Sequence, residues 1–347
     1  MPSAKTEASE LSVAFGILRL DPTTAYTQDE INRFFAGSLT PEKYAKYRVE
    51  YQRNLQLYHR LYNVGHRMGM AGKPFYQAKT VQWTGPHQQA TTTSVAKDLL
   101  VANTPISVKT ESNVVANLSP SNMMVNLPGG MAPSSREENW FLSTRPDEYQ
   151  DLYVFVQAMR SELQDLSQDV RTFEKQASRA DRKRIQKILK EYSPEEKSEF
   201  TRRYRKLCHG VAESSAAIFN ENLSTSLASR ARRAVLEDLS RWFFRLDAVP
   251  YILCGIDDKE DFSLGVPDLT SWFREWEFAD VVASPDLNRG QSVVDFIMTC
   301  RKKDDLSEQR IAYHAEIRWS HGRFSGSPES KLYKEFAWRD LPFLQEC

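Results

Sequence analysis

Apolar residues at helical spacing mark the first part of the chain. Thr40 before Pro41 and Glu42 is typical of a helix start, and the following apolar positions keep a spacing close to 3.6 residues. The pattern predicts helices over 28–36 and 41–66, with an aromatic stripe packed against a core and formed by Tyr44, Tyr47, Tyr51, Leu55, Tyr58 and Tyr62. The first ten residues, small and polar, are interpreted as a frayed terminus, and Gly65–Gly72 as a loop.

A second pattern begins near Thr80, where short runs rich in Val, Ile and Thr replace the helical spacing. It predicts strands near 93–102 and 105–110, joined by a turn at Asn103-Thr104-Pro105. From 117 to 135, Asn, Ser, Pro and Gly dominate, which indicates a long functional loop or a linker.

The middle and the last third also differ from each other. Residues 146–206 and 211–246 predict long helices, interrupted at Ser193-Pro194 and near Gly210. The last third predicts a short helix over 268–277 and strands over 251–256, 292–300 and 310–319. We therefore expect an α/β (α+β) fold with a mixed sheet, divided into an α/β core (1–135), a helical and basic segment (136–246) and a C-terminal α/β section (247–347).

Composition narrows the class of protein. The chain has 347 residues, 41% of them hydrophobic and 27% charged, as in ordinary globular proteins. Its 46 basic residues equal its 46 acidic residues, so any attraction to nucleic acid must be local. No apolar run approaches the roughly 18 residues of a membrane span, and the four cysteines lie far apart. We expect a protein of the cytoplasm that does not enter membranes.

The candidate chemistry lies on the two strands of the first part. Asp98 belongs to the first strand, and Ser107 and Lys109 follow on the second, where residues two apart point to the same face. A carboxylate and a lysine amine can converge there.

This arrangement resembles the core of the PD-(D/E)XK nuclease superfamily, in particular type II restriction endonucleases. In that superfamily an Asp on one strand is followed by a (Glu/Asp)-x-Lys on the next, and Asp98 with Ser107-Val108-Lys109 matches this order. Here Lys97 stands where the family has proline, and Ser107 replaces the second carboxylate. The resemblance implies a nuclease-like core and Mg²⁺-dependent cleavage of double-stranded DNA.

The resemblance also implies roles for single residues. Asp98 would bind Mg²⁺, Lys109 would orient or deprotonate the attacking water, and Ser107 would contribute its hydroxyl. Because hard cations prefer several oxygen ligands, a second acid is expected. Two acids are equal candidates for this position: Glu50, on the predicted helix before the strands, and Glu111, beyond Lys109 on the same strand face. Both are candidate catalytic residues, and Glu50 is in addition the candidate metal ligand.

Basic residues mark two further segments as candidate DNA contacts. Cations outnumber acids between Arg171 and Lys206, and an arginine-rich stretch continues this surplus near residue 230. The run Glu316–Phe324 carries arginines able to read guanine edges. The candidate DNA-binding residues are Arg182, Lys183, Arg184, Arg230, Arg232, Arg233, Arg318 and Arg323.

These features favour a restriction or phage-defence endonuclease. A homodimer would suit double-strand cleavage, and a cognate methyltransferase or a defence-system subunit are possible partners. Two alternatives stay open. One is a non-catalytic nucleic-acid-binding or scaffold protein with a degenerate nuclease-like core; the other is a helical protein-interaction module, favoured if the basic helices pair internally with Glu191, Glu195 and Glu199.

Overall fold

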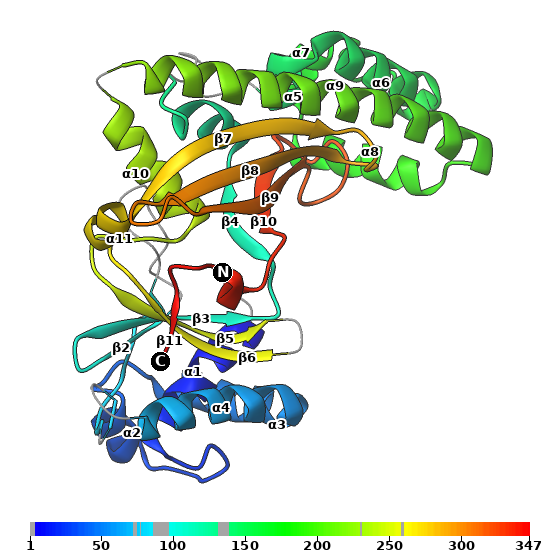
Figure 1. Ribbon diagram of the computed structural model, residues 1–347. Helices are drawn as coiled ribbons and strands as arrows, with labels where there is room; N and C mark the ends of the chain where they lie inside the picture. Colours follow the sequence, from blue (N-terminus) through cyan, green and yellow to red (C-terminus); the bar gives the residue numbers. More distant parts are fainter. Residues whose placement is uncertain are drawn as a thin grey trace.

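The computed structural model confirms the α+β class. It describes residues 4–71, 75–76, 78–85, 97–130, 139–229, 231–257 and 260–347, which form two sheets and the helices around them (Figure 1). None of the helices within these ranges is both long and apolar enough to cross a membrane.

The first sheet carries the strands that were expected to hold the chemistry. Its order is β1-β2-β3-β5-β6-β11. β3 pairs with β5 in parallel and with β2 antiparallel. The strands are β1 (Gln82–Trp83), β2 (Leu99–Val101), β3 (Thr104–Thr110), β5 (Tyr251–Asp257), β6 (Glu260–Val266) and β11 (Gln345–Glu346). The predicted strand at 93–102 begins outside the described residues, and its described part is β2.

The second sheet is antiparallel throughout and has the order β4-β10-β9-β8-β7. Its strands are β4 (Val114–Leu118), β7 (Trp276–Asp286), β8 (Ser292–Lys302), β9 (Glu308–Arg318) and β10 (Glu329–Lys334). Strands from before residue 135 and after residue 247 thus meet in both sheets. Helix α11 (Leu269–Glu275) leads directly into β7.

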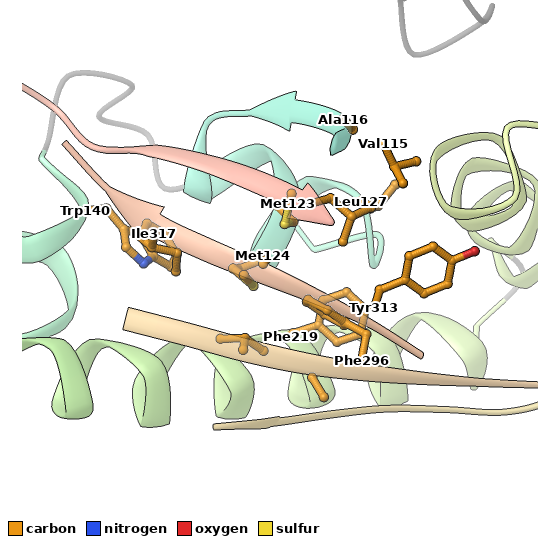
Figure 2. Close-up of a cluster of buried hydrophobic side chains, with 14 of the residues drawn as sticks. Val115, Ala116, Met123, Met124, Leu127, Trp140, Phe219, Phe296, Tyr313 and Ile317 are labelled. Atoms are coloured by element: carbon orange, nitrogen blue, oxygen red, sulfur yellow. The ribbon is translucent and has the colours of Figure 1, made fainter. Parts of the chain in front are cut away.

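The middle segment is helical, as predicted, and α9 packs on β7 and β8 of the second sheet. Figure 2 shows the core below it, where Phe219 of α9 meets Phe296 of β8 at 5.0 Å between ring centroids. Gly210 lies inside α9 without interrupting it, contrary to expectation, and packs against the Arg145 side chain. The helices are α5 (Trp140–Thr144), α6 (Pro146–Ala158), α7 (Val170–Gln176), α8 (Arg179–Lys190), α9 (Pro194–Leu227) and α10 (Arg232–Phe243).

The predicted loop at 117–135 is partly structured. Residues Asn122–Asn126 form a π-helical turn that buries Met123 and Met124 in the core shown in Figure 2. Residues 131–138 lie outside the described part of the chain.

The N-terminal region forms a second core against the first sheet. It contains α1 (Ala4–Leu18), α2 (Gln28–Phe34), α3 (Pro41–Arg53) and α4 (Leu55–Met70), drawn in blue in Figure 1. Thr40 caps α3 as predicted, by accepting from Lys43 N at 3.3 Å. The expected helix 41–66 is divided at Asn54, whose side chain caps α4 by accepting from Leu57 N.

Helix α1 corrects the expectation of a frayed terminus. Nearly all of it is buried, from Ala8 to Leu18, because it packs closely along α4. The contact is made by glycines: a Cβ on Gly65 or Gly69 would collide with the backbone of Val13 or Ile17. Gly65 and Gly69, expected in a loop, are helical residues that let two backbones approach.

We predict that Gly65→Ala destabilises the protein. Alanine favours a helix by about 1 kcal/mol over glycine, yet here its Cβ has to push α1 away, and overpacking of this kind costs about 1–3 kcal/mol. The free energy of unfolding in urea, followed by circular dichroism, should therefore fall. Gly290→Ala is the matched control, because no heavy atom lies within 4 Å of a Cβ at that position. An unchanged or raised unfolding free energy for Gly65→Ala would contradict the close packing.

Candidate functional site

Asp98 and Ser107 lie opposite each other across β2 and β3. Leu99 pairs with Ile106, so the preceding residue faces Ser107, and Lys109 follows on the same side of β3. The Asp98 carboxylate accepts from Val108 N at 2.6 Å and from Ser107 Oγ at 3.3 Å, both through Oδ2. Asp98 and Ser107 therefore meet across the two strands, whereas no hydrogen bond or ion pair joins Asp98 to Lys109. One oxygen of the Asp98 carboxylate, Oδ1, has no hydrogen-bond partner among the described residues.

The Lys109 amine is the unusual group of the site. Within the described ranges, no acceptor or carboxylate lies at hydrogen-bonding or ion-pair distance from its Nζ, although the side chain is largely shielded from water. Burial first, and then the positive charge of Arg245, lower the pKa of Lys109 to about 8. A lysine in this state can exchange a proton near neutral pH.

A second acid comes from α1, the segment that was expected to be a frayed terminus. Glu10 of α1 is 6% exposed, and its Oε2 accepts from Trp83 Nε1 at 2.7 Å. Burial first, and then the negative charge of Asp98, raise the pKa of Glu10 to about 8. The charge of one carboxylate thus disfavours ionisation of the other. We call Glu10, Asp98, Ser107 and Lys109 the acid–lysine cluster.

The backbone around Asp98 is fixed by neighbouring contacts. Thr84 holds the end of this strand, since its Oγ1 donates to the carbonyl oxygens of Lys97 and Asp98 at 2.6 and 2.9 Å. The Lys97 amine bonds to Asp247 Oδ2 at 2.9 Å and lies 3.5 Å from the centre of the Tyr251 ring. Burial lowers the pKa of Lys97 to about 8. The residue that departs from the family pattern is therefore built into the site.

Gly255 explains how β5 comes close to Lys109. The two residues pair in the parallel register, and Gly255 has a φ of 145°, in the region that favours glycine. A Cβ at this position would overlap the Lys109 carbonyl. The glycine thus lets β5 support the strand that carries the lysine.

The two acids predicted to complete the site lie in other contacts. Glu50 accepts from the Tyr58 hydroxyl at 3.0 Å and pairs with Arg53 at 3.3 Å. Glu111 is exposed, has a φ of 47° and lies 3.5 Å from Lys5. No hydrogen bond or ion pair links either acid to Asp98, Ser107 or Lys109. Glu10, whose charge interacts with that of Asp98, becomes the candidate for the second acid.

The residues present fit a divalent cation held partly by substrate. Among the described residues, no group of three or more His, Cys, Asp or Glu side chains could hold a metal ion. Mg²⁺ nevertheless often takes one or two carboxylates and fills its remaining positions with phosphate oxygens and waters. Glu10 and Asp98 each keep one carboxylate oxygen free of hydrogen bonds to the described residues, and the negative charge of Asp98 raises the pKa of Glu10.

Most of the predicted DNA-binding arginines are held by internal contacts. Arg182 pairs with Glu174, Arg184 with Asp165 and Arg233 with Glu237, at 3.0, 2.6 and 2.6 Å. In the C-terminal run, Arg318 pairs with Glu316 at 3.2 Å, and Arg323 lies 3.8 Å from the Tyr204 ring.

Other cations of this set remain open to solvent. Lys183 and Arg232 are exposed, and Arg230 lies outside the described residues. Within α9, Arg202 and Arg203 both pair with Glu199. Lys187 of α8 lies 4.0 Å from Glu191, just after that helix. The basic surplus of these helices is therefore only partly available to a phosphate backbone.

Glu10 was missed because its segment was interpreted as a terminus. A signal was present: the residues from Ala4 onward are good helix formers, and the apolar run from Leu11 to Leu18 follows at once. Arg245 and Asp247 were also missed, and they carry no comparable signal, because only the packing of β5 beside β3 brings them near Lys97 and Lys109.

In comparisons with known proteins, no family model, curated protein or solved structure matches the chain.

We predict that Glu10 makes the stability of the protein depend on pH. Its pKa is about 4.5 in the unfolded chain and about 8 in the fold. Between these values folding must take up a proton, so this contribution is complete below pH 4.5 and is lost as the pH rises towards 8. In urea titrations from pH 5.5 to 8.5, the free energy of unfolding of the wild type should fall by an amount on the order of a few kcal/mol because of this group. Glu10→Gln should not show this fall.

The exposed Glu221 of α9 provides the control for this experiment. Glu221→Gln should follow the wild-type pH dependence over the same range. If Glu10→Gln also follows it, the carboxyl of Glu10 is ionised in the folded protein and the raised pKa is wrong.

Proposed function

We propose that the protein is a metal-dependent endonuclease that hydrolyses phosphodiester bonds of DNA, of the restriction or phage-defence type. One observation carries this proposal: among the described residues the Lys109 amine has no hydrogen-bond or ion-pair partner, although the charges of Asp98 and Glu10 act on it. Structural lysines at this depth are normally held by an acid. Perturbed pKa values at a cluster of this kind are typical of functional sites.

The acid–lysine cluster has the groups that the reaction needs. Glu10 and Asp98 would hold Mg²⁺, which, when bound, stabilises the negative charge that develops on the phosphate oxygens. Asp98 is oriented for this by Val108 N and Ser107 Oγ, both on Oδ2, so that Oδ1 stays available. Glu10 has to release its proton before it can serve as a ligand.

Lys109 provides the proton chemistry. With a pKa of about 8, a fraction of its amine is neutral at physiological pH and can accept a proton from the attacking water. The protonated amine then offsets charge on the phosphate. Ser107 does not replace the family's second carboxylate as a ligand; it donates to Asp98, and Glu10 supplies the second acid from α1.

Binding of the duplex would extend beyond this cluster. The exposed cations of α7 to α9, among them Lys175, Arg179, Lys183 and Lys190, are free to neutralise phosphates. A homodimer would place one cluster against each strand. A cytoplasmic setting and a cognate methyltransferase or defence-system subunit belong to the same proposal.

The internal pairing of Arg202, Arg203 and Lys187 favours a second candidate, a helical protein-interaction module without affinity for DNA. A catalytically inactive DNA-binding protein with the same core is the other alternative. The two differ in whether DNA binding survives at moderate salt.

We predict metal-dependent cleavage of mixed plasmid and phage DNA in Mg²⁺ or Mn²⁺. Lys109→Met and Asp98→Asn should lower the rate by about 10²-fold or more, because each removes a group that acts in the transition state. Lys46→Met and Asp304→Asn, both at exposed positions, are the matched controls and should cleave like the wild type. Discrete fragments resolved on agarose gels would report the cleavage.

Two outcomes would overturn the proposal. Cleavage that survives in both Lys109→Met and Asp98→Asn would place the chemistry elsewhere or in a contaminant. Salt-dependent DNA binding without cleavage in either metal would establish the inactive DNA-binding protein, and no binding at moderate salt would favour the interaction module.

We also predict that the cleavage rate at subsaturating Mg²⁺ rises with pH between about 7 and 9. Both Glu10 and Lys109 have a pKa of about 8, and both must lose a proton, one to bind metal and the other to accept from water. Initial rates over this range test the direction. A rate that stays flat or falls across it would show that Lys109 acts only in its protonated form.

A further inference from the structure

Arg245 is a buried cation that forms no ion pair with an acid in the described part of the chain. It lies between α10 and β5, is 7% exposed, and has a φ of 57°. Its Nη1 donates to the Val115 carbonyl at 3.0 Å. Its Nε is shielded from water and has no hydrogen-bond partner, and no carboxylate of the described residues lies within ion-pair distance of the guanidinium.

The fold holds the backbone of Arg245 beside β5. The carbonyl oxygen of Arg245 accepts from the Tyr251 hydroxyl at 2.7 Å. The Tyr251 ring carries the Lys97 amine, which bonds to Asp247. Arg245 is thereby fixed beside the strands of Asp98 and Lys109, and its charge acts on both Lys97 and Lys109.

This arrangement is costly for a purely structural arginine. Burial of a charge without a counter-ion destabilises a fold, and nearby cations add to the cost. Asp247, the nearest acid in sequence, is bonded to Lys97 instead. Arg245 and Lys109, whose charges act on each other, therefore both lack an acid at ion-pair distance among the described residues.

We propose that Arg245 and Lys109 form a subsite for a phosphate group, and that its occupant is a phosphodiester of the nucleic-acid backbone. The Nε and Nη2 edge of a guanidinium matches two phosphate oxygens, and the Lys109 amine adds a point charge. This inference rests on the proposed function for the identity of its ligand. It assigns Arg245 the task of binding the phosphate on which Lys109 and the two acids act.

The first test uses inorganic phosphate without metal, so that it does not depend on cleavage. In EDTA at pH 7, phosphate should raise the melting temperature of the wild-type protein by about 2 °C or more. Arg245→Gln, which can still donate to the Val115 carbonyl but has no charge, should lose this shift. Arg245→Lys, which keeps the charge but not the planar edge, should retain part of it.

Arg310→Gln is the matched control, because Arg310 is exposed on β9, and it should shift like the wild type. An equal shift in the wild type, Arg245→Gln and Arg245→Lys would overturn the subsite. If Arg245→Gln does not fold, the comparison of Arg245→Lys and Lys109→Met with the wild type decides the same question.

The second test identifies the source of the phosphate. In EDTA, a duplex should bind Arg245→Gln about tenfold or more weakly than the wild type, and the salt dependence of binding should fall by about one phosphate contact. A shift with inorganic phosphate but unchanged DNA affinity would overturn the assignment to a nucleic acid. If Arg245→Gln loses both the phosphate-induced shift and the DNA affinity, while the wild type cleaves no DNA, the subsite stands and the proposed endonuclease fails.

Discussion

The structure depends on the close approach of α1 and α4. Helices normally pack with their axes 8–10 Å apart, but here Gly16, Gly65 and Gly69 leave space for the opposite backbone, and a Cβ at any of them would strike it. This contact buries α1 along most of its length and anchors the N-terminal core against β3 and β5. It also delivers Glu10 to Trp83 and to the electrostatic neighbourhood of Asp98. Without this glycine contact, the site would consist of a single carboxylate and a lysine.

The second constraint is electrostatic. Acids and cations are gathered in a region that water hardly reaches, and their pairing is incomplete. Lys97 and Asp247 neutralise each other, whereas Glu10, Asp98, Lys109 and Arg245 form no ion pair with one another. Each unpaired charge then shifts its neighbours, which is why Glu10 tends to keep a proton and Lys109 to lose one. Such an arrangement costs stability, and proteins tolerate that cost mainly where a ligand supplies the missing charges. A divalent cation would neutralise the acids, and a phosphate would neutralise the cations.

The helical segment shows why charge counts alone are a weak guide to DNA binding. Its surplus of cations looks like a continuous basic surface in the sequence, yet Arg182, Arg184 and Arg203 are held by acids. Glu174 and Asp165, the partners of Arg182 and Arg184, lie outside α8, so linear spacing along that helix could not reveal these two pairs. The remaining exposed lysines still offer phosphate contacts, and they lie on α7, α8 and α9 (Figure 1).

The sequence by itself determined the α+β class, the helical middle segment, the capping of α3 by Thr40, and the position of Asp98 opposite Ser107. These features follow from local rules: helical or alternating periodicity, capping residues, and two strands joined by a short turn. Only the tertiary structure decided the second acid and the buried arginine. Glu10 reaches the site through a helix crossing that requires glycines expected in a loop, and Arg245 through a parallel pairing of β3 with β5 across about 140 residues. Contacts between segments this far apart depend on shape and packing, which no local pattern records.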